Sequence, residues 1–282
     1  MIDLHSHSVF SDGSETPERV VELAAGAGCS AVALTDHDGL EGVGRAQARA
    51  ESLGIRLVPG CEVSCAWRGT SIHILCYFIS PGAGPLHDEL VRLREDRETR
   101  NHRLVARLVE LGIPLTYEEV VREAGGTGIG RPHFASVLVR QGAAVSVQDA
   151  FDRWIGNGRP AYIPKARVTP GEIARLAAGS GGIAVLAHPL SLGLEPGPLE
   201  QEVAVLAEAG VRGLECHYGR YEPAVRADLV ALARRHGLVP TGGSDFHGSY
   251  KPDLSMGTGT GDLCVPDALL DELEAAVGPS PA

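Results

Sequence analysis

Seven short apolar runs in this 282-residue chain each end in, or in one case contain, side chains of the kind that bind metal ions. The runs cover residues 2–4, 31–35, 55–59, 72–79, 183–187, 211–215 and 238–241, and their composition is typical of buried strands. The associated side chains are His5 and His7, Asp36 and His37, Glu62, His73, His188, Glu215 and His217, and Asp245 and His247. In a parallel α/β barrel the carboxyl ends of all strands lie on one face. Residues from the two ends of the chain would therefore meet at one site.

Helical patterns fill most of the intervals between these runs. Examples are T-P-E-R-V-V-E-L-A-A-G-A-G near the amino terminus and E-P-A-V-R-A-D-L-V-A-L-A-R-R-H-G near the carboxyl terminus. Thr16-Pro17 and Thr169-Pro170 are typical N-cap and first-turn residues. The alternation of strands and helices predicts an α/β fold with a parallel sheet and helices outside it, either a barrel or a doubly wound sheet.

The alternation stops in the middle of the chain, where the patterns are helical until about residue 161. We expect residues 1–83 and 166–282 to form one α/β domain, and residues 84–165 to form an inserted helical subdomain. Residues 85–170 carry 13 Lys and Arg against 11 Asp and Glu, whereas the remainder carries 12 against 25. Arginines interleaved with acids on the first inserted helix indicate a mostly solvated face; they are Arg92, Arg94, Arg97, Arg100, Arg103 and Arg107.

The formal net charge of −11 argues against a surface that coats long nucleic acids. No apolar run approaches the roughly 18 residues that suggest a membrane span. The amino terminus shows neither a basic leader region nor a cleavage motif of small residues. We therefore expect a cytoplasmic protein with no membrane partner.

The donor types at the strand ends indicate a metal centre. Imidazole nitrogens mixed with carboxylates suit zinc, manganese or iron better than magnesium or calcium alone. His5 and His7 are two residues apart, as are Asp245 and His247, so each pair would point the same way on a strand. One buried histidine is usually an ordinary core residue, but six histidines with several acids at strand ends are not explained in this way. The remaining helical histidines, His87, His102 and His236, are interpreted as surface or packing residues.

The order of these motifs resembles that of the PHP (polymerase and histidinol phosphatase) family. The motifs are H-S-H-S-V-F-S-D-G, L-T-D-H-D, G-C-E-V-S followed by His73, A-H-P and G-S-D-F-H. The middle segment, with G-R-P-H-F-A and G-R-P-A-Y-I-P-K, is similar to the insertion of one branch. That branch includes nucleoside 3′,5′-bisphosphate phosphatases that also trim short oligonucleotides from the 5′ end. The resemblance implies a distorted seven-stranded β/α barrel with three divalent metal ions.

The resemblance also implies a role for each donor. The first metal would be held by His5, His7, Glu62 and Asp245, and Glu62 would bridge to a second metal held by His73 and His188. The third would be held by Asp12, His37 and His247. We expect Asp36 to orient a ligand histidine rather than to bind metal. The three ions would be manganese, zinc or iron.

Closely spaced metal ions suit the hydrolysis of a phosphomonoester. They lower the pKa of a bound water, neutralise phosphoryl oxygens and stabilise the leaving alkoxide. We expect a metal-bridging hydroxide as nucleophile, with Glu62 and Asp245 as catalytic ligands and no covalent intermediate. The sequence contains no obvious nucleophile elbow or P-loop. His217 would either protonate the leaving oxygen or orient a neighbouring group, and the sequence does not choose between these roles.

The insertion is expected to select the substrate, a nucleotide or a short oligonucleotide. Arg131 and Lys165, with His133 beside them, lie in the segments that resemble the branch and suit a second phosphate. The leading prediction is a metal-dependent phosphatase of nucleoside 3′,5′-bisphosphates. The alternatives are a 5′-3′ exonuclease on short RNA, a histidinol-phosphate phosphatase, and a non-catalytic module that binds metal or nucleotide.

Overall fold

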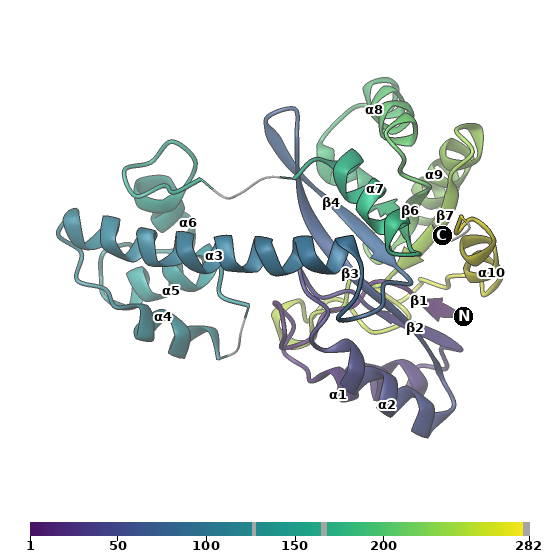
Figure 1. Ribbon diagram of the computed structural model, residues 1–282, viewed down its shortest axis with the longest axis horizontal. Coiled ribbons are helices and arrows are strands. Elements are labelled where there is room, and N and C mark those ends of the chain that lie inside the picture. Colours follow the sequence, from purple (N-terminus) through teal and green to yellow (C-terminus); the bar gives the residue numbers. More distant parts are fainter. Residues whose placement is uncertain (126–127, 165–167, 279–282) are drawn as a thin grey trace. The chain divides into compact units, whose positions relative to one another are not determined.

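The computed structural model describes residues 1–125, 128–164 and 168–278 (Figure 1). The chain divides into two compact units, one formed by Met1–Leu90 with Arg167–Ala282 and the other by Val91–Ala166. We call them the barrel unit and the inserted unit. None of the described helices is long and apolar enough to cross a membrane.

A seven-stranded sheet forms the barrel unit, and its strands lie side by side in the order in which the chain makes them. They are β1 (Ile2–Asp3), β2 (Ala31–Leu34), β3 (Arg56–Trp67), β4 (Thr70–Tyr77), β5 (Ile183–Leu186), β6 (Gly213–Tyr218) and β7 (Val239–Gly243). The pairs β1/β2, β2/β3, β5/β6 and β6/β7 are parallel. The α/β fold with seven strands is therefore confirmed.

One strand departs from the predicted parallel sheet, because β4 runs antiparallel to both of its neighbours. The chain reverses at Arg68 and Gly69, which have φ angles of 44° and 85° between the paired residues Trp67 and Thr70. Two positive φ values in a two-residue loop are typical of the turn that joins a β-hairpin. A parallel connection would have needed a crossover of a dozen or more residues. The expectation of an entirely parallel sheet was wrong at this strand.

Backbone hydrogen bonds bring the ends of the sheet together. Leu4 N donates to Gly242 O at 3.1 Å, Asp245 N donates to His5 O at 2.9 Å, and His7 N donates to Phe246 O at 2.9 Å. The seven strands therefore form a nearly closed barrel, as the resemblance implied. This closure places the segment after β1 directly beside the segment after β7.

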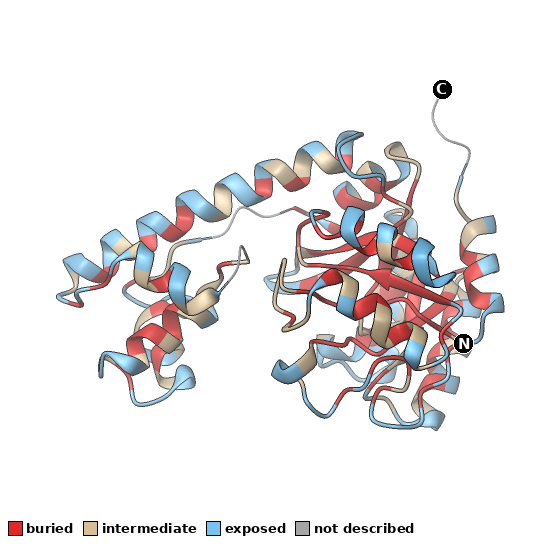
Figure 2. Ribbon diagram, turned by 90° about the horizontal axis from the view of Figure 1, so that it is seen from below, coloured by how far each residue is buried: buried red, intermediate tan, exposed pale blue. Residues whose placement is uncertain are grey.

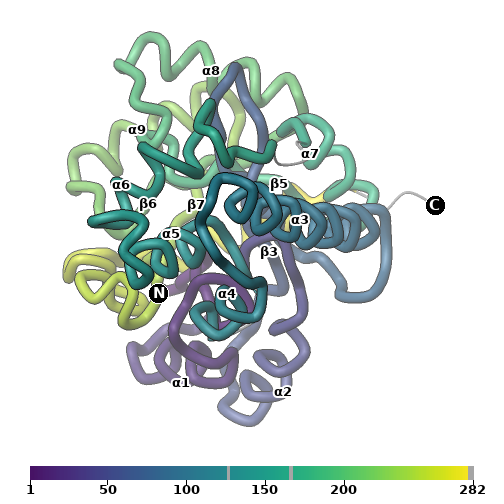
Figure 3. Tube along the Cα trace, turned by 90° about the vertical axis from the view of Figure 1, so that its left-hand side faces the viewer, coloured from purple at the N-terminus to yellow at the C-terminus, as the bar shows by residue number. Residues whose placement is uncertain are grey.

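Helices surround the strands of the barrel unit (Figure 3). They are α1 (Pro17–Gly26), α2 (Val43–Leu53), α7 (Pro170–Gly179), α8 (Pro196–Glu208), α9 (Pro223–Arg235) and α10 (Ala268–Ala275). The side chains of Thr16 and Thr169 cap α1 and α7, as the sequence predicted, and Glu172 completes a capping box at α7. The buried core joins side chains of the strands, such as Ile2 of β1 and Tyr77 of β4, to Leu269 and Leu273 of α10. Figure 2 shows that the strands of the sheet are largely buried.

The inserted unit is helical over its described residues. Its helices are α3 (Pro85–Glu110), which starts in the barrel unit, α4 (Tyr117–Ala124), α5 (Arg131–Arg140) and α6 (Val147–Ala150), followed by a π-helical turn, η1 (Phe151–Ile155). Thr116 and Glu119 form a capping box at α4. Leu104, Leu108, Phe134 and Leu138 belong to a hydrophobic core within this unit. The unit thus has a core of its own.

Candidate metal centre

The Glu62 carboxylate lies at the middle of a ring of five histidines. Its Oε1 atom is 2.8 Å from Nδ1 of His73 and 3.0 Å from Nε2 of His188. Its Oε2 atom lies 3.2 to 3.4 Å from nitrogens of His5, His7 and His37. Only 1% of the Glu62 side chain is exposed. A single buried carboxylate therefore touches donors from β4 and from the segments after β1, β2 and β5.

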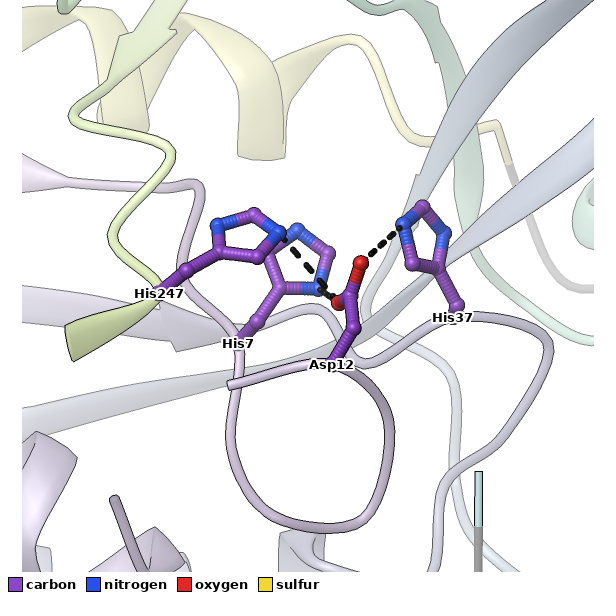
Figure 4. Close-up of side chains that lie close together, drawn as sticks. All are labelled: His7, Asp12, His37 and His247. Carbon is purple, nitrogen blue, oxygen red and sulfur yellow. Dashed lines mark ion pairs between the residues drawn. The ribbon is translucent and has the colours of Figure 1, made fainter. Parts of the chain in front are cut away.

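Two more carboxylates complete the cluster. Asp245 Oδ1 lies 3.5 Å from His5 Nε2 and 3.4 Å from His7 Nε2. Asp12 Oδ1 lies 3.2 Å from His247 Nε2, and its Oδ2 lies 3.5 Å from His37 Nε2 (Figure 4). Donor atoms gather in three overlapping groups, which are His5, His7 and Asp245, then His37, Glu62 and His73, then His7, Asp12, His37 and His247. All nine predicted metal-ligating residues therefore lie in one cluster.

The topology explains how residues so distant in sequence meet. The candidate ligands after β1, β2, β5 and β7 follow the carboxyl ends of parallel strands, which lie on one face of the barrel. His73 lies early in β4 instead, opposite Ser64 of β3, because β4 is antiparallel and its amino-terminal half reaches the same face. His188 and Asp245 have positive φ angles of 27° and 55°. Such backbone strain is often found at functional sites.

The donors fit metal ions. Buried atoms His5 Nε2, His7 Nε2, His37 Nδ1 and Asp12 Oδ1 lack a hydrogen-bond partner, although carboxylate or imidazole atoms lie 3.2 to 3.5 Å away. Buried polar atoms are rarely left in this condition. Ligands that are each about 2.1 Å from a tetrahedral metal ion lie about 3.4 Å from one another. The spacing and the unsatisfied atoms are those expected of a metal centre.

Electrostatics at the cluster favour a bound cation. Burial alone would raise the pKa of Glu62, but His37, His73 and His5 hold that pKa well below its usual value. Burial alone would lower the pKa of His7, but the neighbouring carboxylates of Asp245 and Glu62 raise it to about 10. Glu62 therefore remains ionised at neutral pH, and the same carboxylates that stabilise a proton on His7 would stabilise a metal ion in its place.

Glu215 belongs to the site, although sequence reasoning gave it no role there. It is fully buried, and its Oε1 lies 2.7 Å from His5 Nδ1. The carboxylate of Glu215 accepts a hydrogen bond from His5 Nδ1, which leaves Nε2, the nitrogen that faces the cluster, as the one available to a metal ion. Glu215 Oε2 accepts from the backbone N–H of His188 at 2.6 Å. One carboxylate thus positions two candidate ligands.

We expect Glu215→Gln to weaken metal binding by about 10- to 100-fold, because an amide no longer enforces the His5 tautomer. Competition with a fluorescent chelator measures this affinity. Glu208→Gln removes the same charge from an exposed position on α8 and should leave the affinity unchanged. Equal metal affinities in the two variants would contradict the positioning role of Glu215.

A β-bulge in β6 decides which of its side chains face the cluster. Glu215 pairs with Thr241 but His217 pairs with Gly242, so β6 contains one extra residue here. The shift brings Tyr218 to the cluster, where its hydroxyl donates to Asp245 Oδ2 at 2.8 Å. Burial and the charge of Arg226 on α9 lower the pKa of His217. Among the described residues, no hydrogen bond or ion pair joins His217 to the cluster.

Lys251 also contacts the cluster and was not anticipated. Its Nζ lies 2.7 Å from Asp245 Oδ2, the oxygen that Tyr218 also contacts.

Asp36 accepts hydrogen bonds from Ser8 and from the Ser11 hydroxyl, which lies 3.4 Å from His7 Nδ1. Asp36 therefore reaches a candidate ligand through Ser11 rather than directly.

Two of the three predicted substrate-binding residues, Arg131 and His133, lie in the inserted unit. Arg131 begins α5, donates to Ile155 O at 3.4 Å, and lies over the rings of Phe151 and Tyr162. His133 Nδ1 accepts from the backbone N–H of Gly130 at 3.1 Å. Lys165 lies outside the described residues.

Comparisons with known proteins identify the family of this chain. Residues 3–122 match the PHP domain family. A 3′,5′-nucleoside bisphosphate phosphatase from Chromobacterium violaceum is 33% identical over 280 residues, covering 98% of this chain and 97% of its own. The 5′-3′ exoribonuclease Rnm of Salmonella typhimurium is 34% identical over 247 residues, covering 87% and 84%. A crystal structure from Bifidobacterium adolescentis, provisionally classed as a metal-dependent phosphoesterase, has a TM-score of 0.80 at 31% identity and covers 99% and 96%.

Proposed function

The chain belongs to the PHP domain family of metal-dependent phosphoesterases, and we propose that it removes a phosphate from small nucleotides, preferentially nucleoside 3′,5′-bisphosphates. One observation carries the proposal: nine donor residues form a cluster in which buried nitrogen atoms lack hydrogen-bond partners. A cluster of this kind binds multivalent cations, and such cations promote the hydrolysis of a phosphomonoester dianion at neutral pH.

We propose three divalent ions of manganese, zinc or iron at this cluster. His5, His7, Glu62 and Asp245 would hold the first, Glu62 with His73 and His188 the second, and Asp12, His37 and His247 the third. When bound, the ions would acidify a water molecule and neutralise phosphoryl oxygens. His7 and His37 each belong to two of the three donor groups, so the ions held by these groups would lie close together.

The chain's own residues have separate tasks in this proposal. Glu62 and Asp245 supply buried negative charge that attracts cations. Glu215 fixes His5, and Tyr218 with Lys251 holds the Asp245 carboxylate so that its other oxygen faces the histidines. Because these contacts exist before any substrate arrives, little reorganisation is needed during the reaction.

The substrate class follows from the whole-length relative and from the insertion. The bisphosphate phosphatase matches nearly the entire chain, including the inserted unit. We assign Arg131, His133 and Lys165 to recognition of the second phosphate, since arginine forks and lysine ammonium groups suit phosphate. The second candidate is 5′-3′ cleavage of short RNA, which is favoured by the exoribonuclease relative. The net charge of −11 argues against long RNA.

We also propose that the enzyme acts in the cytoplasm. All six cysteines are free thiols, and five of them are buried. Free thiols persist in a reducing compartment, whereas secreted proteins commonly pair them.

Hydrolysis by metal-reconstituted protein tests the proposal. Adenosine 3′,5′-bisphosphate, AMP, histidinol phosphate and a short 5′-phosphorylated RNA are offered side by side. Release of inorganic phosphate is measured for the first three substrates, and release of mononucleotides is measured for the RNA, because an exonuclease cleaves phosphodiester bonds. We expect the bisphosphate to give the highest kcat/KM. A preference for RNA would favour the exonuclease, and a preference for histidinol phosphate would refute the proposed substrate class. Metal binding without turnover of any of the four would indicate the non-catalytic module instead.

A further inference from the structure

A lysine contacts the metal centre of a chain that contains almost no lysine. Of the 25 Lys and Arg residues, only two are lysines, Lys165 and Lys251, and Lys165 lies outside the described residues. The Nζ atom of Lys251 lies 2.7 Å from Oδ2 of the candidate ligand Asp245. Within the described part of the chain, no arginine forms an ion pair with a candidate metal ligand. A chain that otherwise uses arginine for its positive charges therefore places a lysine at this site.

The cluster has a buried floor and an open rim. The floor consists of side chains that are at most 5% exposed, which are His5, His7, Glu62, Asp245 and His247. The rim consists of side chains that are 16% to 46% exposed, which are Asp12, His37, His73 and His188. The Lys251 side chain is 32% exposed and so belongs to the rim. A ligand that enters the cluster from solvent passes the rim, and a negative charge on it would meet this ammonium.

The backbone of Lys251 is tied to the loop that carries Asp12. Lys251 directly follows a short 3₁₀ turn, η3 (Gly248–Tyr250), and its N–H donates to the carbonyl of the first residue of η3 at 3.3 Å. Within η3, Ser249 N donates to Oγ of Ser14, two residues after Asp12, at 2.9 Å. The segment that carries the ammonium is thus held at the cluster before any substrate binds.

Lys251 is not needed merely to hold Asp245. The Tyr218 hydroxyl donates to the same Oδ2 atom at 2.8 Å. Burial and the charge of Asp245 raise the pKa of the Tyr218 phenol far above its ordinary value, so this hydroxyl keeps its proton and remains a donor. The Lys251 ammonium has three N–H donors, and among the described residues its hydrogen-bond partner is Asp245 alone. Two donors are therefore left for a ligand.

We propose that Lys251 binds the phosphoryl group of the substrate through a contact between its ammonium and one oxygen of that group at the metal centre. An ammonium binds a single oxygen as a compact point charge, whereas the planar arginine fork is best matched by two oxygens. A point charge suits an oxyanion whose other oxygens are neutralised by metal ions. The identity of the phosphoester rests on the proposed function, whereas the contact requires only the metal centre and an oxyanion that reaches it.

Binding of inorganic phosphate to the metal-loaded protein tests this role. Isothermal titration compares the wild type with Lys251→Gln, Lys251→Arg and Arg19→Gln. Arg19 is exposed on α1, where it pairs with Glu22, so Arg19→Gln removes the same charge as a control. We expect Lys251→Gln to weaken phosphate binding by about 10- to 100-fold, which corresponds to one hydrogen bond from a charged donor. Lys251→Arg keeps the charge and should recover part of the affinity, and Arg19→Gln should equal the wild type.

Metal affinity separates phosphate binding from a structural role. An ammonium beside Asp245 repels cations, so Lys251→Gln should bind zinc or manganese as tightly as the wild type or more tightly. Competition with a fluorescent chelator in the absence of phosphate measures this affinity. Weaker metal binding by Lys251→Gln would show that Lys251 acts by holding Asp245 in place. Unchanged phosphate binding would show that Lys251 does not reach the ligand, and either result would overturn the proposal.

Turnover is measured separately, so the two proposals fail independently. In Lys251→Gln the KM for adenosine 3′,5′-bisphosphate should rise by about as much as the phosphate affinity falls. Phosphate binding that depends on Lys251, in a metal-loaded protein that hydrolyses no phosphoester offered to it, would refute the proposed function and support the role of Lys251. Hydrolysis of the bisphosphate, with KM and phosphate affinity unchanged in Lys251→Gln, would support the proposed function and overturn that role.

Discussion

Glu62→Gln should abolish metal binding at the second proposed site and lower phosphate release by at least about 10³-fold. Glu62 contacts five histidines, and no other carboxylate in the cluster contacts as many. These histidines are His5, His7, His37, His73 and His188. Glutamine keeps the shape of the side chain but removes its charge and one acceptor. The five imidazoles that share the Glu62 carboxylate would face a neutral amide in the variant. The cluster would therefore attract cations less strongly.

Metal content by mass spectrometry and phosphate release are measured on the same preparations. Glu208→Gln, the exposed control on α8, should match the wild type in both. Glu62→Asp retains the charge on a shorter side chain and should keep part of the metal, which distinguishes lost charge from lost structure. Circular dichroism verifies that each variant is folded. A folded Glu62→Gln protein with full metal content and activity would contradict a central role for Glu62.

The donor residues could be predicted because their positions depend on strand ends. Each parallel strand delivers its following residues to one face, so the order of strands sufficed to bring His5, His37, His188 and Asp245 together. His73 did not fit that rule, since it lies within a strand. The reversal at Arg68 and Gly69 explains it, because it makes β3 and β4 a hairpin, which the apolar pattern of the two runs does not indicate.

Residues that support the ligands were not predictable in the same way. The contact of Glu215 with His5 joins positions 210 residues apart and depends on how the barrel closes. The position of Tyr218 depends on a bulge, and Lys251 lies in a loop without a motif. Arg100 resembles its solvated neighbours on α3 in sequence, and its burial depends on packing within the inserted unit. These features arise from tertiary contacts that local patterns do not encode.

Closure of the barrel beside the cluster should be intolerant of even one methyl group. A Cβ atom on Gly243 would lie 2.3 Å from the backbone nitrogen of His5 and 2.8 Å from Asp3 Oδ1. Neither can give way cheaply, because the first belongs to the backbone and Asp3 already accepts from Ser244 N and His5 N. We expect Gly243→Ala to lower the free energy of unfolding by about 3 kcal/mol. Displacement of His5 should also cost about 100-fold in phosphate release.

Thermal and denaturant unfolding measure the stability change, and the matched control is Gly44→Ala. Gly44 is exposed within α2, and a Cβ there meets nothing within 4 Å. Alanine at that position should stabilise the protein by about 0.5 to 1 kcal/mol, because it favours the helix. Opposite signs for the two substitutions are therefore expected. If Gly243→Ala left the free energy of unfolding and the metal content unchanged, β1 and β7 could separate without disturbing His5. That result would contradict the idea that the close approach of these strands positions the cluster.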